Sequence, residues 1–286
     1  MIQQKKKIEY VIHFFVILMS MVCFFVVCMD IQKNPMDQVG GLQIAGIIAT
    51  AVCINIIKAL RMYVLLFDFK ISLYKFVKFY TVTAFVNITV PYKCGELYRG
   101  YCLGNMVKSV SEGYIMVILD RFVDTLALIT VVVGANIFLG VDMDLVYLIL
   151  VAFVCVFFTI YLLFQPLYTY WNHYLVFHRS SNNTLKALHF LEVCHKLYAK
   201  IREIIKGKFI ILYVLSLIAW LVEMVSVMIL SHGFTVKYIS QYLKDILAGE
   251  TTQYNYFFIV GSILIYVAAL GLVILKRKGK NIKCRR

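Results

Sequence analysis

Charged residues are scarce in this chain, because Asp, Glu, Lys and Arg make up only 15% of its 286 residues. A soluble globular domain carries about 25% charged residues, so the scarcity excludes an ordinary water-soluble domain. The sequence also lacks a P-loop, a GxGxxG loop and a metal-ligand cluster, and its eight cysteines form no CxxC pair. Hydrophobic residues reach 62% and aromatic residues 15%, which excludes intrinsic disorder. The composition therefore indicates an integral membrane protein.

Six long apolar stretches can each form a helix that crosses the membrane. A crossing helix needs roughly 20 apolar residues for a hydrocarbon core of about 30 Å. Only helices and closed barrels satisfy their backbone in lipid, and the alternation of a membrane barrel is absent. We therefore expect an all-α polytopic membrane protein with about six transmembrane helices, forming a single integral membrane domain over residues 1–286. The stretches are 10–29, 41–57, 113–139, 145–167, 209–230 and 256–275.

The basic residues fall on alternate sides of these stretches. The net charge is +14, and 25 of the 29 Lys and Arg residues lie in four segments, against 3 in the other connecting segments. Basic loops stay in the cytoplasm, so both termini are expected there. Because the basic residues lie between apolar runs, we expect no nucleic-acid partner. The four basic segments are 1–9, 58–112, 168–208 and 276–286, and the three others are 30–40, 140–144 and 231–255.

One apolar segment does not fit this alternation. Residues 79–90 give about 12 residues, or about 18 Å of helix, which is too short to cross. Basic residues flank the segment on both sides, with Lys78 before it and Lys93 after it. We expect residues 79–91 to form one limb of a re-entrant hairpin, over about 71–100, that dips into the membrane and returns.

Polar residues cluster directly after this limb. Pro91 lacks an N–H and ends the limb, and Gly95 permits a close backbone approach. Glu96 and Arg99 are three residues apart, so they can pair on one face of a helix. The candidate residues of this first cluster are Asn87, Pro91, Lys93, Gly95, Glu96 and Arg99.

A second cluster, Asp120, Arg121 and Asp124, lies inside the stretch 113–139. Asp120 and Asp124 share a helix face, and Arg121 can reach Asp124. Ionisable groups inside a membrane are costly and need partners, and the first cluster is the nearest source. Two interpretations stay open: a closed salt-bridge network that only holds the hairpin, or a network that also binds a charged ligand. Glu223, in the stretch 209–230, is a further candidate.

Residues 185–205 show apolar positions at steps of three and four, with basic residues around the rest of the helix. This pattern predicts a cytoplasmic amphipathic helix. It either lies on the anionic inner leaflet or packs against the helix bundle.

The two clusters and their spacing resemble the lysylphosphatidylglycerol synthase transmembrane family, also called flippase-like. That family includes the N-terminal membrane domain of the multiple peptide resistance factor. The residues that carry the resemblance are Ala59-Leu60-Arg61, Asn87, Pro91, Gly95-Glu96-x2-Arg99, Ser109–Gly113 and Asp120-Arg121-x2-Asp124.

The resemblance implies a bacterial or archaeal inner-membrane protein that moves lipids or lipid-linked sugars between leaflets. The expected mechanism is passage of an anionic headgroup through a polar intramembrane cleft. A phosphate would bind Lys93, Arg99 and Arg121, because an arginine fork suits it. The expected partners are a phospholipid or lipid-linked sugar and anionic inner-leaflet lipids. Further candidates are a glycosyltransferase or lipid synthase and a second copy of the chain.

The alternatives are a membrane enzyme and an accessory subunit of a cell-envelope glycosyltransferase. The enzyme would be of the phosphatidylglycerol lysyltransferase type or related to glycosyltransferases. Outside the segment that contains the expected hairpin, the longest segment between the stretches, 168–208, has about 41 residues, too few for a fold that binds a nucleotide-sugar or an aminoacyl-tRNA. We therefore expect no catalytic residues, no cofactor and no metal.

Overall fold

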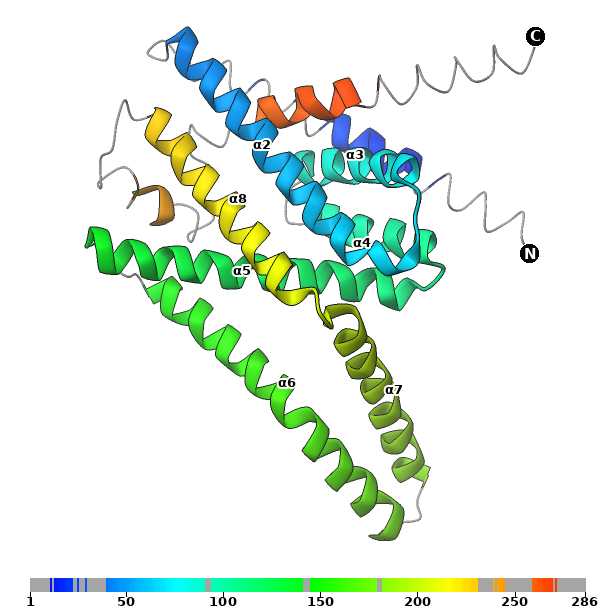
Figure 1. Ribbon diagram of the computed structural model, residues 1–286. Helices are drawn as coiled ribbons and strands as arrows, with labels where there is room; N and C mark the ends of the chain where they lie inside the picture. The colour runs from blue at the N-terminus through cyan, green and yellow to red at the C-terminus, as the bar shows by residue number, and fades with distance from the viewer. Residues whose placement is uncertain are drawn as a thin grey trace, which may run out of the picture.

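The computed structural model describes residues 40–90, 94–140, 145–178 and 182–230 without interruption. It also describes residues 241–244, a few single positions, and the two short helices His13–Val22 and Ile259–Ala269. Across these residues the protein is helical and contains no strand (Figure 1). The elements are α2 (Gly41–Leu65), η1 (Phe67–Phe69), α3 (Leu73–Thr89), α4 (Cys94–Val107), α5 (Val110–Leu139), α6 (Leu145–His178), α7 (Asn182–Ile205) and α8 (Phe209–Leu230).

Three described helices are long and apolar enough to cross a membrane: α2, the segment Tyr147–Phe177 of α6, and α8. The chain is therefore a multi-pass membrane protein. The bounds of α8 are those predicted, and α5 ends at the predicted Leu139, followed by Gly140 in the left-handed conformation at φ 65°. Two predicted stretches were too short, because α2 continues past residue 57 to Leu65 and α6 continues past residue 167 to His178.

Helices α2 and α8 lie side by side and run antiparallel, while α5 crosses them (Figure 1). At one end of the pair, the amide of Gln43 donates to the carbonyl oxygen of Ile229 at 3.0 Å. At the other end, Nζ of Lys208 lies 2.5 Å from a carboxylate oxygen of Asp68. These two contacts fix the register of the two helices at both of their ends.

Helices α3 and α4 form a helical hairpin beside α5. Its first limb is a helix of 17 residues, longer than the 12-residue apolar segment that indicated it. The second limb, α4, packs through glycines, where almost no space remains. A Cβ on Gly95 would lie 2.4 Å from Cα of Asn87 on α3, and a Cβ on Gly113 of α5 would lie 2.3 Å from the backbone N of Gly104. The close approach that Gly95 was expected to allow is thus to α3.

Helices α6 and α7 form a V that extends away from the other helices (Figure 1). The 34 residues of α6 span about 51 Å at 1.5 Å per residue, well beyond a hydrocarbon core of about 30 Å. The helix predicted at 185–205 is α7, and its apolar face contacts α6 through the ring of Tyr198, which stacks on Phe164 at 4.9 Å between centroids. Leu185, at the start of α7, is 66% exposed. The ring contacts therefore attach α7 to α6, and much of the remaining surface of α7 is exposed.

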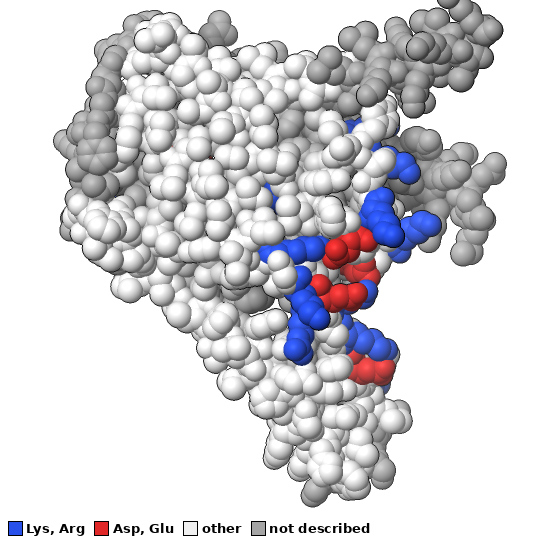
Figure 2. All heavy atoms as spheres, viewed as in Figure 1, with Lys and Arg blue, Asp and Glu red and all other residues white. Residues whose placement is uncertain are grey.

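Charged side chains occupy one part of the visible surface (Figure 2). On that face they gather where α4, α5 and α7 approach one another, and the remaining described surface is almost free of them. Nζ of Lys200 on α7 lies 3.1 Å from a carboxylate oxygen of Glu112 in the first turn of α5. The ends of α5 and α7 that this ion pair joins therefore lie on the same side of the protein.

Candidate functional site

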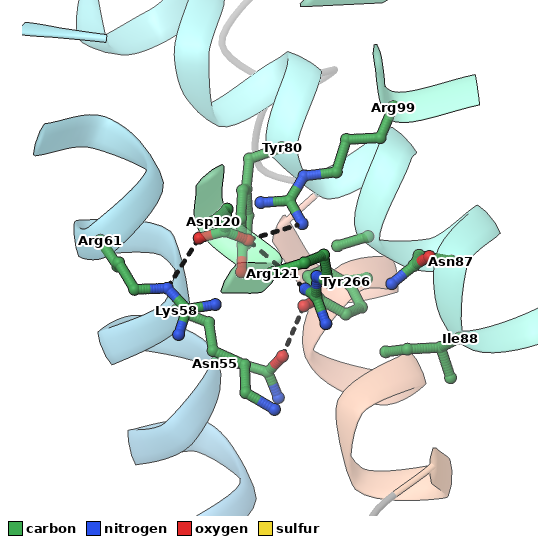
Figure 3. A pocket seen from close by; sticks show the side chains of 11 residues that line it. Asn55, Lys58, Arg61, Tyr80, Asn87, Ile88, Arg99, Asp120, Arg121 and Tyr266 are labelled. Atoms are coloured by element: carbon green, nitrogen blue, oxygen red, sulfur yellow. Dashed lines mark hydrogen bonds and ion pairs between the residues drawn. The ribbon is translucent and has the colours of Figure 1, made fainter. Parts of the chain in front are cut away.

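Asp120 of α5 is the centre of the charge network, and three arginines surround it (Figure 3). Nε of Arg61 donates to its Oδ1 at 2.7 Å, while Nη1 of Arg99 and Nη2 of Arg121 lie 3.3 and 3.4 Å from its Oδ2. The residue is only 1% exposed. A buried carboxylate needs such partners, because removing a charge from water is expensive unless it is paired and hydrogen-bonded.

Arg61 connects α2 to two other helices. It is 1% exposed, and its Nη1 contacts both a carboxylate oxygen of Asp124 on α5 and the hydroxyl of Ser216 on α8 at 2.6 Å. The indole of Trp220 on α8 donates to the carbonyl oxygen of Asp124 at 3.3 Å. The charge network is therefore also the place where α2, α5 and α8 are joined.

Arg121 connects the network to the hairpin. Its Nε lies 3.0 Å from Oε1 of Glu96 on α4, in a geometry that does not form a hydrogen bond, and its Nη1 lies 3.8 Å from Asp124. The amide of Asn87 on α3 donates to Glu96 at 3.5 Å. The side chain of Arg121 is 40% exposed, which makes it the most exposed of the three arginines, although its Nε is buried.

These groups border a pocket of about 100 Å³ in which cations outnumber anions. Lys58, Arg61, Arg99 and Arg121 line it, and Asp120 is the single acidic residue in the lining. Nε of Arg99 is buried and has no hydrogen-bond partner among the described residues. An unsatisfied buried donor among excess positive charge favours an anionic ligand with hydrogen-bond acceptors. The full lining is Asn55, Lys58, Arg61, Tyr80, Ala84, Asn87, Ile88, Arg99, Asp120, Arg121 and Tyr266.

Neutral polar groups form the opposite wall of the pocket (Figure 3). The hydroxyl of Tyr266 donates to Oδ1 of Asn55, and the amide nitrogen of Asn55 donates to the hydroxyl of Ser262 at 2.9 Å. Both Tyr266 and Tyr80 are buried. Because Asn55 belongs to α2, these bonds attach the helix Ile259–Ala269 to α2 beside the arginines.

The structure brings together most of the residues that the sequence singled out. Glu96 and Arg99 do not pair with each other as the sequence suggested, because Glu96 contacts Arg121 and Arg99 contacts Asp120. The carboxylate of Glu223, a further candidate, accepts a hydrogen bond from Tyr242 at 2.7 Å, and none of the ion pairs described above includes it. Pro91 and Lys93 lie outside the described residues. The candidate residues of the network are Asn87, Glu96, Arg99, Asp120, Arg121 and Asp124, with Gly95 packed against Asn87.

Sequence reasoning missed Arg61 as a site residue. The apolar stretch was ended at residue 57, so Lys58 and Arg61 were counted with a cytoplasmic segment. Helical spacing could have indicated that Arg61 is buried, because it lies seven residues after buried Ile54 and is followed by buried Met62 and Leu65. A charge on the buried face of a helix that is still continuing indicates a partner inside the bundle.

The network can hold and orient an anion, and its carboxylates are tied to arginines. In the part of the chain that the structure describes, no three His, Cys, Asp or Glu side chains are grouped as metal ligands.

One family model matches most of the chain. The family model of the lysylphosphatidylglycerol synthase transmembrane region matches residues 15–248, which include α2 to α8. No curated protein and no solved structure matches the chain significantly. The matched region covers most of the 286 residues and contains the whole charge network. The chain belongs to the lysylphosphatidylglycerol synthase transmembrane region family.

Proposed function

We propose that this chain is a membrane-embedded translocase for a lipid or lipid-linked glycan with an anionic headgroup. The observation that carries the proposal is the pocket, which is lined by Lys58, Arg61, Arg99 and Arg121 and by one acidic residue, Asp120, while Glu96 and Asp124 pair with Arg121 and Arg61 outside the lining. Arginine forks that line a pocket favour a phosphate-type anion. The family of the chain, with its membrane domain and its link to lipid metabolism, supports the same substrate class.

In this mechanism the ligand replaces protein carboxylates as the partner of the arginines. Arg121 is shared among Glu96, Asp120 and Asp124 at 3.0 to 3.8 Å, so an incoming anion can take the place of Glu96, whose carboxylate then keeps the hydrogen bond from Asn87. Arg61 contacts two carboxylates and a serine in a fully buried position, so it stays in place. The partly exposed Arg121 thus receives the headgroup, while the buried Arg61 maintains the contacts between the helices.

The proposal includes the membrane topology expected from the sequence. Six crossing helices, both termini in the cytoplasm and a re-entrant α3–α4 hairpin would place Glu96 and Arg99 near the cytoplasmic leaflet, beside Asp120. The ion pairs Asp68–Lys208 and Glu112–Lys200 support this placement. They join segments that the distribution of basic residues assigns to one side. A bacterial or archaeal inner membrane is the proposed location.

The decisive variant is Arg99→Lys. Lysine keeps the positive charge but loses the planar fork that binds a phosphate through two hydrogen bonds. The variant should be measured in proteoliposomes with a fluorescent phosphatidylglycerol probe, where a quencher reports the fraction in each leaflet. We expect normal insertion and a severalfold slower change of leaflet, with the lipid mass unchanged.

The matched control is Arg202→Lys, because Arg202 lies on the exposed surface of α7. It should transport at the wild-type rate. Wild-type transport by Arg99→Lys at normal expression would reduce the network to a structural role. A change in lipid mass that requires the protein would instead favour the transferase alternative.

A further inference from the structure

A second cavity lies beside the polar pocket, between α4, α5 and α6. Its volume is about 330 Å³, and apolar side chains dominate its walls. The charged residues in its lining are Glu96 and Arg121, which also belong to the charge network. The lining residues are Glu96, Leu97, Tyr114, Val117, Ile118, Arg121, Phe122, Thr125, Phe153 and Phe157.

Arg121 lines both cavities, so it stands at the boundary between them. Its guanidinium reaches Asp120 on the side of the polar pocket, and its Nε is buried without a hydrogen-bond partner among the described residues. On the other side, the wall continues from Arg121 to Phe122, whose ring lies 4.6 Å from that of Phe157 between centroids. A cation that is paired with Glu96 and Asp120 therefore stands where a polar space becomes an apolar one.

The outer wall of the second cavity is α6, which contacts the rest of the protein sparsely. Phe153 is 61% exposed, and most of the apolar segment Tyr147–Phe177 is exposed as well. In a membrane protein such a surface faces lipid chains. The second cavity is therefore a groove that can exchange its contents with the bilayer along α6.

A third cavity provides an internal comparison. It has about 400 Å³ and is also apolar, but its lining contains no charged residue. It lies between α5 and α8, where Leu221 is 57% exposed. This cavity has the properties of an ordinary lipid-facing groove, whereas the groove at Arg121 adds a cation at one end.

We infer that the groove at Arg121 holds an acyl chain of the same lipid whose anionic headgroup binds the polar pocket. This inference rests on the proposed function and makes the site one with two compartments, joined at Arg121. Binding of the chain in the groove contributes little hydrophobic free energy to lipid binding, because the chain moves there from a bilayer that is already apolar. Its contribution is orientation: the chain is held in line with the headgroup, so a free phosphate without a chain lacks half of the contacts.

The test uses photoreactive lipids with the wild-type protein in nanodiscs. One probe is phosphatidylglycerol with a diazirine near the end of one acyl chain, and the control probe is phosphatidylcholine with the same chain. Labelled positions are mapped by mass spectrometry. We expect severalfold more labelling of the groove segments of α5 and α6 by the anionic probe than by the neutral one.

Two tryptophan variants separate the groove from general lipid contact. Ile118→Trp fills the groove from α5, and Leu221→Trp adds the same side chain to the third cavity. The two residues are 55% and 57% exposed, so both variants should fold, as thermal unfolding can verify. Ile118→Trp should abolish the preference for the anionic probe, whereas Leu221→Trp should leave it unchanged.

Equal labelling of the groove by the two probes, or a preference that survives Ile118→Trp, would overturn the inference. A third probe, with its photoreactive group on the phosphatidylglycerol headgroup, distinguishes this failure from failure of the proposed function. Labelling of the polar pocket without chain labelling in the groove would overturn the groove alone. Absence of headgroup labelling in the polar pocket would overturn both proposals.

Discussion

Nε of Arg61 on α2 lies 2.7 Å from Oδ1 of Asp120 on α5, and the two side chains are 2% and 0% exposed. Water cannot solvate either charge, so the stability of each charged side chain depends on the other and on the nearby ion pairs. Because Arg61 also contacts Ser216 on α8, the stability of the three-helix junction depends on these charges. The contacts therefore predict a direct link between the charge network and folding.

Asp120→Asn tests this link, because the amide keeps the shape and removes the charge. Three arginines lose a shared partner, and breaking a buried pair costs about 3–5 kcal/mol. We expect the free energy of unfolding in detergent to fall by that amount. The matched control is Glu192→Gln, which removes a carboxylate that pairs with Lys196 on the exposed surface of α7 and should leave the stability nearly unchanged. Equal stability of Asp120→Asn and the wild type would contradict the role of Asp120.

Gly113→Ala tests the close packing of α4 against α5. The new Cβ would lie 2.3 Å from the backbone N of Gly104, so the helices must separate. We expect a loss of about 1–3 kcal/mol, the usual cost of overpacking, with a lower temperature of thermal unfolding.

Gly134→Ala is the control on the same helix, since a Cβ there meets nothing within 4 Å. Alanine is the better helix former, so this control should be neutral or more stable by up to about 1 kcal/mol. If both alanine variants unfolded alike, α4 would not be held by the glycine contact.

Lys200→Met tests the attachment of α7 to α5. Nζ of Lys200 lies 3.1 Å from Glu112, and this hydrogen bond raises the pKa of Lys200 above its usual 10.5. The ion pair between Lys200 and Glu112 should therefore persist from neutral pH to about the usual pKa of lysine. It should be lost as the pH rises through the raised pKa of Lys200. A partly exposed pair contributes about 0.2–1 kcal/mol.

The measurement for Lys200→Met is hydrogen exchange of the α7 amides, which should become faster. Lys196→Met provides the comparison, because Lys196 pairs with Glu192 on the same helix and not with α5. Faster exchange in both variants to the same extent would show that the link between the helices is not the cause.

Single-cysteine labelling tests the topology. With the native cysteines replaced, Met36→Cys and Asp142→Cys should react with an impermeant reagent added outside sealed cells, because the basic residues place these segments outside. Asn105→Cys, an exposed position near the end of α4, should stay unlabelled until the membrane is opened. External labelling of that position would exclude the re-entrant hairpin.

Apolar length predicted the helices that face lipid, and charge spacing predicted much of the site. Residues 209–230 formed α8 as expected, because Lys208 directly precedes this apolar stretch and marks where it begins. At α2 the same reasoning stopped early, because Lys58 and Arg61 look like the end of a span until the partners of Arg61 are known. The glycine contacts could not be predicted, because the close approach of Gly104 and Gly113 depends on how two helices meet in space.

The sparse packing of α6 has a mechanical consequence for the protein. Ion pairs and glycine contacts tie α2, α4, α5 and α8 into one stiff block, whereas α6 is held to α5 mainly by ring contacts such as Phe122 with Phe157. Thermal motion in the plane of the bilayer would therefore displace α6 well before it disturbed the block. Under the proposed function, a lipid headgroup would reach Arg121 sideways, from within the leaflet, and the length of α6, about 51 Å, would let its far end at α7 act as a lever for that movement.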